Sequence, residues 1–218
     1  MHSKAIEDQK KLLVLTPIQR ETLIGILLGD ACLETQNQGR TYRLKVEQGA
    51  HHEAYVRHLY ELFRPWVLSP PRSKRCVASS GSPTMSWVFQ TVSHQAFRFY
   101  AHQFYGEAGK QVPKLIHRWL TPRGLAYWFM DDGSMKSSQS KGVIFNTQAF
   151  GQRDVERLIQ ALSSCFALRT KLRRQKDGYQ IYVSGSSFED FVKRIDAYVI
   201  PEMRHKLPLA RRTRLPKE

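Results

Sequence analysis

The pattern of apolar and polar positions along the chain occurs twice, with a spacing of roughly 100 residues. Each copy opens, after a Thr-Pro pair (Thr16-Pro17 and Thr121-Pro122), with a short segment that is apolar nearly all round. Threonine caps helices and proline is tolerated in a first helical turn, so a buried helix is predicted in each copy. Two alternating segments, an amphipathic helix, two more alternating segments and a last helix follow. We therefore expect an α+β fold of two pseudo-twofold-related αββαββα repeats, with the apolar helices paired at their interface.

The repeat predicts three parts of the chain: an N-terminal extension over residues 1–14, a first repeat over 15–118 and a second repeat over 119–218. Either repeat alone is small for an independent core, which favours packing of one against the other.

Both apolar helices end in an acid, Asp30 in the first repeat and Asp132 in the second. Gly25, Gly29 and Ala126 are small enough for the two helices to pack closely, which would bring both acids to the pseudo-twofold axis. A carboxylate at a helix C-terminus lies at the unfavourable end of the helix dipole, and a divalent cation would compensate it. The alternative is a polar cap at the end of each core helix. Two acids at matching positions favour a metal site that faces phosphate.

The alternating segments carry one apolar face and one polar face. In TYRLKVEQ, Leu44 and Val46 alternate with Arg43, Lys45 and Glu47, and LRTKLRRQ in the second repeat has the same character. The apolar face must cover the helices, whereas the polar face can read base edges in a DNA major groove. Simple solvation of these charges is the alternative, and the bias shared by several strands favours DNA contact.

The charge balance favours a polyanionic partner. The chain has 34 Lys+Arg against 19 Asp+Glu, a formal net charge of +15. Nucleic acid is the first candidate partner and an anionic membrane the second. No apolar run reaches the ~20 residues of a spanning helix, and no long basic amphipathic helix is evident, so no membrane partner is predicted.

The cysteines and histidines do not suggest a zinc site. Three cysteines without a C-x-x-C pair argue against structural zinc and a disulfide framework, and they suit a reducing compartment. His51, His52 and His58 lack the H-E-x-x-H spacing and partner cysteines, so they are predicted to lie on the surface of the amphipathic helix.

The segments LIGILLGDA and LAYWFMDDG, at residues 23–31 and 125–133, resemble the paired motifs of single-chain LAGLIDADG homing endonucleases. The first motif is more divergent, because Leu28 replaces its earlier acid and Ala31 its final glycine. The resemblance implies a β-sheet saddle on double-stranded DNA with a long asymmetric target site, a monomer, and Mg²⁺ as cofactor with Mn²⁺ able to substitute. It places the metal-binding and catalytic acids at Asp30 and Asp132. Asp131 is expected either to be structural or to contact the metal-binding acids without holding the metal itself, because only one of two adjacent helical side chains can point at the axis.

The resemblance also implies a catalytic lysine near each centre. Matching the prolines near the lysines in KQVPKL and IPEMRHKLP assigns these roles to Lys110 and Lys206. Such a lysine would help to activate water or stabilise a pentavalent phosphorane. A plain phosphate contact is the alternative for both.

DNA contacts are expected from the strands and the turns beside them, with Arg and Lys favouring guanine and Gln favouring adenine. The candidates are Arg40, Arg43, Lys45, Glu47, Arg72, Lys74, Arg75, Gln90, Lys141, Asn146, Gln148, Arg169, Lys171, Arg173 and Tyr182.

The function implied is a site-specific DNA endonuclease, a hydrolase that cuts one phosphodiester on each strand of an intronless allele and so initiates group I intron homing. The cuts would leave 5′ phosphates and short 3′ overhangs. An RNA maturase that assists splicing of its host intron RNA and a nuclease-inactive DNA-binding regulator are the alternatives. Retention of both acids and both lysines favours the nuclease. The N-terminal sequence resembles no signal or transit peptide. Intron-encoded members are organellar, and the scarcity of asparagine favours a chloroplast over a mitochondrion.

Overall fold

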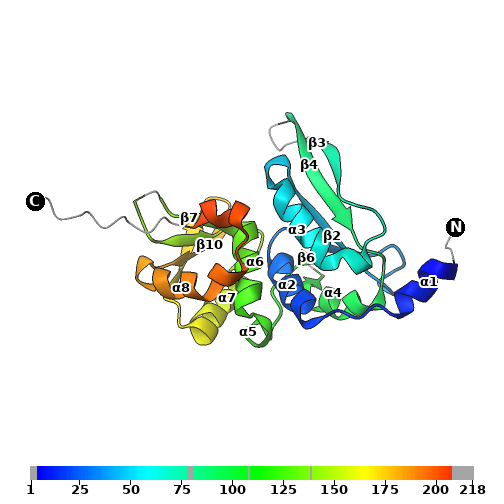
Figure 1. Cartoon of the computed structure of the whole chain (residues 1–218). Helices are drawn as coiled ribbons and strands as arrows, with labels where there is room; N and C mark the ends of the chain where they lie inside the picture. The colour runs from blue at the N-terminus through cyan, green and yellow to red at the C-terminus, as the bar shows by residue number, and fades with distance from the viewer. Residues whose placement is uncertain (1–3, 78–80, 108, 138, 208–218) are drawn as a thin grey trace, which may run out of the picture.

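The two-repeat organisation is present in the computed structural model, which describes residues 4–77, 81–107, 109–137 and 139–207. Figure 1 shows the repeats side by side, with the two motif helices α2 and α6 adjacent at the centre. The first repeat contains α2 (Pro17–Leu28), β1 (Cys32–Glu34), β2 (Arg43–Gly49), α3 (Glu53–Phe63), β3 (Arg72–Val77), β4 (Pro83–Gln90) and α4 (Arg98–Phe104). The second contains α6 (Pro122–Asp132), β7 (Gly133–Met135), β8 (Val143–Phe145), α7 (Gln152–Phe166), β9 (Thr170–Gln175), β10 (Gly178–Val183) and α8 (Phe188–Ile195). The predicted order αββαββα is confirmed in both repeats.

Several elements lie outside this order. The chain begins with α1 (Lys4–Lys11), and a short strand pair, β5 (Tyr105–Gly106) with β6 (Gly109–Lys110), precedes α5 (Ile116–Trp119). Short 3-10 segments lie between the larger elements, at Ala50–His52, Arg64–Trp66, Gln95–Phe97 and Gly185–Ser187, and after α8, at Asp196–Tyr198 and Pro201–Lys206. Within the described part of the chain, no helix is both long and apolar enough to cross a membrane.

The two four-stranded sheets have the same topology. The strand orders are β1-β2-β4-β3 and β7-β8-β10-β9, with all neighbours antiparallel. Val46 pairs with Phe89 in the first sheet as Phe145 pairs with Ile181 in the second, and these four apolar side chains are buried against the helices. The opposite face of each sheet is therefore the polar one, as the alternation predicts.

The motif helices begin as their sequences predict. The Thr16 side chain accepts a hydrogen bond from the Gln19 backbone, and the Gln19 side chain accepts one from the Thr16 backbone, which completes a capping box. The Thr121 hydroxyl accepts a hydrogen bond from the Gly124 backbone at the start of α6. Both helices thus enter the core with one of their first backbone donors satisfied by a side chain.

Backbone contact between the motif helices depends on glycine. A Cβ atom on Gly25 would stand 2.3 Å from the Gly124 carbonyl oxygen and 2.9 Å from Tyr127 Cβ. Close packing was expected from Gly25, Gly29 and Ala126. Gly25 meets the backbone of Gly124, and Gly29 meets the side chain of Asp131. The contact between Gly25 and Gly124 sets how near the two helix ends lie to each other.

Candidate active site

Three acidic side chains meet where the motif helices end. Helix α2 stops at Leu28, so Asp30 follows its C-terminal end, whereas Asp132 is the last residue of α6. The Asp131 carboxylate accepts a hydrogen bond from the Asp30 backbone N–H at 3.2 Å. It lies so close to Gly29 that a Cβ there would stand 2.3 Å from Asp131 Oδ2. The expected reason for a structural Asp131 is therefore wrong, because its side chain does reach across the axis, but its hydrogen bonds still fit a structural role.

The carboxylates interact strongly with one another. Burial, followed by the nearby charge of Asp30, raises the pKa of Asp132 to about 7, although Lys110 and a hydrogen bond from Trp128 Nε1 oppose the shift. Burial and the charges of Asp30 and Asp132 also raise the pKa of Asp131 well above its ordinary value. Ionisation of all three acids at once is therefore unfavourable unless a cation lies beside them.

The two predicted lysines lie at the same helix ends. Lys110, on β6, donates to the carbonyl oxygens of Gly29 and Ala31, and Lys206 donates to those of Met130 and Asp131. Burial lowers the pKa of both lysines, and the three aspartates oppose that shift. Cations at carbonyl oxygens near a helix C-terminus are electrostatically favourable. The structure thus gathers the predicted acids and lysines into one pseudo-symmetric group.

The polar face of the first sheet carries most of the contacts predicted for that repeat. They are Arg43, Lys45, Glu47, Arg72, Lys74 and Gln90. Glu34 pairs with Arg43 at 2.8 Å, and Glu47 pairs with Lys45 at 3.1 Å and Lys74 at 3.2 Å.

Glu47 is the centre of this network. Burial alone would raise its pKa, but hydrogen bonds from Ser86, Lys45 and Lys74 prevail and lower it to about 2. Arg75 alternates with Lys74 along β3 and so faces the other way, and Arg40 lies before β2 and lines a hollow with Arg20 and Arg98.

The polar face of the second sheet is differently charged. Asn146, Gln180 and Arg173 form one cross-strand row, and Tyr182 faces Lys171 in the next. Asn146 follows β8 and donates from Nδ2 to the Asp132 carbonyl at 3.0 Å, which places it beside the acids.

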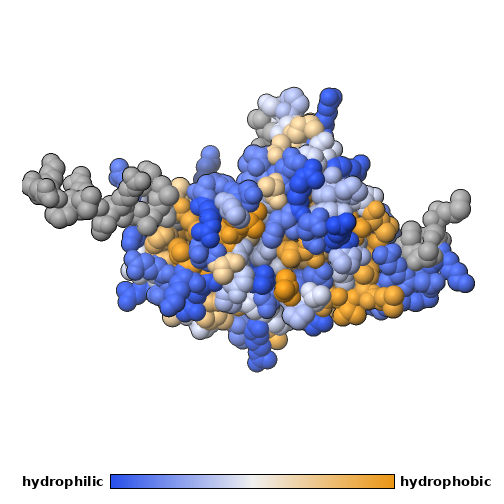
Figure 2. All heavy atoms as spheres, in the orientation of Figure 1, coloured by the Kyte–Doolittle hydropathy of each residue, from blue (hydrophilic) through white to orange (hydrophobic). Residues whose placement is uncertain are grey.

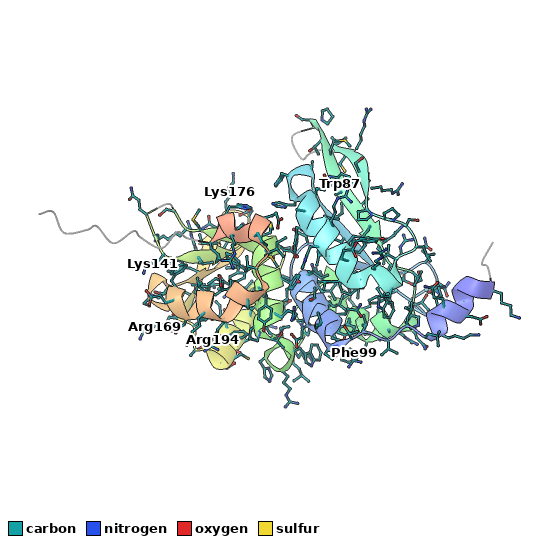
Figure 3. The ribbon with its side chains drawn as sticks, viewed as in Figure 1. Trp87, Phe99, Lys141, Arg169, Lys176 and Arg194 are labelled. Carbon is teal, nitrogen blue, oxygen red and sulfur yellow. The ribbon has the colours of Figure 1, made fainter. Side chains whose placement is uncertain are left out.

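The remaining second-repeat candidates surround this face. Lys141 pairs with Glu189 at 3.1 Å, Arg169 is exposed next to β9, and Gln148 packs against Gly178 at the β9–β10 turn. Figure 3 shows Lys141 and Arg169 at the outer edge of the second repeat, away from the paired helices. These two side chains therefore lie apart from the group of acids and lysines.

A group of exposed apolar side chains lies away from the acids and the polar strand faces. Leu12, Val14, Ile18 and Phe99 are exposed on the N-terminal segment, α2 and α4, where Figure 2 shows hydrophobic residues gathered at the lower right.

Comparison with known proteins agrees with this geometry. Residues 20–191 match the model of the LAGLIDADG DNA endonuclease family. The chain belongs to this family. A probable intron-encoded endonuclease 1 of Wickerhamomyces canadensis is 34% identical over 212 residues, covering 94% of this chain and 91% of that protein. The structure of the homing endonuclease I-WcaI bound to its DNA recognition sequence superposes with a TM-score of 0.89 at 32% identity, covering 96% of this chain and 94% of that one. A cytochrome b mRNA maturase bI2 of Debaryomyces hansenii is 27% identical, covering 86% of this chain and 72% of that protein.

The acids of this LAGLIDADG protein suit a hard divalent cation. Among the described residues, no three His, Cys, Asp or Glu side chains enclose a metal ion by themselves. Asp30 and Asp132 nevertheless offer carboxylate oxygens at a site where burial and mutual repulsion leave negative charge uncompensated. Mg²⁺ takes one or two carboxylates and completes its shell with water and phosphate oxygens, so this donor set fits it.

Several residues of the site were not predicted from the sequence. Gln48 contacts both Asp30 and Asp131, and His52 contacts Gln48. His58 bonds to the Tyr127 hydroxyl at 2.7 Å across the repeat interface. The prediction of surface histidines is wrong for His52 and His58, which are half-buried, because the second repeat covers that side of α3. A glutamine on the apolar side of β2 was the one available signal.

Proposed function

We propose that this protein is a site-specific homing endonuclease that cuts both strands of a long asymmetric DNA target in an intronless allele. The observation that carries this proposal is the paired arrangement of Asp30 with Lys110 and Asp132 with Lys206 at one end of the helix interface. Two polar strand faces flank that end, so a duplex laid across them would present one phosphodiester of each strand to the acids. The two repeats, over residues 15–118 and 119–218, would act together as a monomer.

Asp30 and Asp132 would hold Mg²⁺, with Mn²⁺ able to substitute. Held by these two acids, the cation would supply activation of water and stabilisation of the leaving 3′ oxygen. Lys110 and Lys206 keep positive charge beside the helix ends, where charge develops on the attacked phosphate. Hydrolysis at both strands would leave 5′ phosphates and short 3′ overhangs.

The polar strand faces would supply binding and specificity. Arginine and lysine contacts to phosphates position the duplex, whereas side chains that reach base edges select its sequence. Asn146 and Glu47 occupy equivalent positions in the two sheets, because each follows the paired apolar residue of its strand, Phe145 or Val46. Asn146 contacts the Asp132 carbonyl. Both side chains would contact the DNA nearest the cut.

Cleavage of a duplex library in Mg²⁺, with sequencing of the ends, tests the proposal. Asp30→Asn and Asp132→Asn should each reduce double-strand cutting by about a thousandfold, since an acid that holds the cation contributes several kcal/mol. Asp190→Asn, an exposed acid on α8, is the matched control and should cut normally. A wild-type protein that binds but never cuts would instead fit the nuclease-inactive regulator.

An RNA role is the second candidate, supported by the likeness to a protein named as a maturase. The measurement is splicing of the host intron RNA with the Asp30→Asn variant, which separates RNA assistance from cutting. If the intron RNA splices equally well with and without the protein, the RNA role is wrong. We also propose an organellar gene, in a chloroplast rather than a mitochondrion, which sequencing of the source organelle genomes would test.

A further inference from the structure

Gln48 joins acidic groups from both repeats. It lies near the end of β2, on the buried side of the strand, with 8% of its surface exposed. Its Nε2 atom donates to Asp30 Oδ2 at 2.9 Å and to Asp131 Oδ1 at 3.1 Å. One amide group therefore ties the Asp30 side chain of the first repeat to the motif helix of the second.

The orientation of this amide follows from its partners. Asp30 Oδ2 and Asp131 Oδ1 both accept from Nε2, whose two N–H bonds can serve one oxygen each. The Oε1 atom then faces His52 Nδ1, 3.3 Å away, which can donate to it in the matching tautomer. Every polar atom of the Gln48 side chain is thereby engaged, and the Asp30 carboxylate is held in one rotational position.

The second repeat has no such link among its described residues. The strand register makes Thr147 the counterpart of Gln48, because Val46 and Phe145 occupy equivalent pairs. Thr147 Oγ donates to the Tyr179 carbonyl at 2.8 Å, within its own sheet. Likewise, the counterpart of Asp131 is Gly29, which has no side chain. The two centres are therefore built unequally.

We propose that Gln48 is a positioning residue that orients the Asp30 carboxylate for one of the two strand cleavages and makes the two cuts kinetically unequal. This inference rests on the proposed endonuclease function. Removal of the amide donor leaves Asp30 free to rotate, and loss of a hydrogen bond that orients a metal ligand typically lowers metal affinity or activity by about 10–100-fold.

Gln48→Met tests the proposal, because it keeps length and burial but removes both donated hydrogen bonds. Single-turnover cleavage of the target duplex, labelled separately on each strand, gives two rates. We expect one strand to slow by about 10–100-fold while the other changes by less than about threefold, so that nicked duplex accumulates. Ca²⁺ binding to the protein–DNA complex, measured by calorimetry without cleavage, should weaken at one site.

Gln19→Met is the matched control. Gln19 is also a buried glutamine of the first repeat, and it donates to the Leu62 carbonyl at 2.7 Å and accepts from Trp66 Nε1 at 3.3 Å. It lies at the start of α2, at the opposite end of the helix from Asp30. This variant should lower the melting temperature without changing the ratio of the two strand rates. Gln48→Glu, which keeps the shape but loses the donor, is the second variant if Gln48→Met does not fold.

Equal slowing of both strands, or an unchanged ratio together with unchanged Ca²⁺ binding, would overturn the role of Gln48. Failure of the wild type to cut either strand would overturn the proposed function instead. In that case the Ca²⁺ comparison between wild type and Gln48→Met still tests whether Gln48 positions Asp30.

Discussion

In the first sheet, Arg43, Lys45 and Lys74 are already paired with carboxylates, whereas Lys171 and Arg173 of the second sheet have no such partners among the described residues. In the first, Glu34 and Glu47 each contact two cations. Cations that already have a protein counter-charge gain less from phosphate and release fewer counterions. We therefore expect the second sheet to supply more of the salt-dependent DNA affinity. The first sheet holds a network of ion pairs whose carboxylates can also accept hydrogen bonds from cytosine.

The largest expected effect comes from separating the two repeats. Gly25→Leu would force a side chain into the Gly124 backbone, where even a Cβ atom would stand 2.3 Å from the carbonyl oxygen. Because backbone cannot move aside as a flexible side chain can, we expect a loss of roughly 3 kcal/mol or more of stability. Thermal unfolding should show a melting temperature lower by roughly 10 °C.

Gly151→Ala is the control for that experiment, since a Cβ there meets nothing within 4 Å. Its melting temperature should match the wild type. If Gly25→Leu also melts normally, the close helix contact does not hold the repeats together.

Next in size is the effect on salt dependence. The double variant Lys171→Ala with Arg173→Ala should lower the magnitude of the slope of log K for DNA binding against log salt by about 2, one for each phosphate that the protein no longer neutralises. Arg43→Ala with Lys74→Ala, the matched pair on the first sheet, should reduce it by clearly less, because Glu34 and Glu47 already neutralise these cations. Equal reductions in filter-binding or fluorescence titrations would remove the distinction between the sheets.

Glu47→Gln should make the contribution of the first sheet to salt-dependent DNA binding more like that of the second sheet. Loss of this carboxylate leaves Lys45 and Lys74 with less counter-charge. We expect the salt slope to steepen by about 1 and binding to unrelated DNA to tighten at low salt. A slope that stays the same would show that these lysines do not approach phosphate.

The smallest effect concerns acid stability. The pKa of Glu47 is about 2 in the folded protein, against an ordinary value of 4.5, so folding favours its ionised form. Its contribution to stability is present above pH ~4.5 and is lost as the pH falls toward about 2. The melting temperature of DNA-free wild type should therefore exceed that of Glu47→Gln at pH 6, and the difference should shrink by pH 3. A constant difference would assign the effect to packing.

The sequence alone predicted the repeat, the strand alternation and the ends of the motif helices. These features depend on local periodicity: apolar side chains recur at every second position in β2, and Thr-Pro pairs mark the starts of α2 and α6. The repeat also predicted that Asp30 and Asp132 would meet at the axis between the two copies. The placement of Lys110 and Lys206 beside them was predicted only from the resemblance to the family.

Only the tertiary structure revealed the differences between the copies. The Asp131 side chain reaches the Asp30 backbone because the equivalent position in the first repeat, Gly29, has no side chain. Gln48 contacts the carboxylates of Asp30 and Asp131 because it lies on the buried face of β2. Arg40 and Arg75 belong to the same basic composition as Arg43 and Lys74 but lie off the polar strand face. Periodicity determines which face a residue occupies within its own element, whereas contacts between elements depend on how closely two backbones pack. In this protein that distance is set by Gly25 against Gly124, a contact between residues almost half the chain apart.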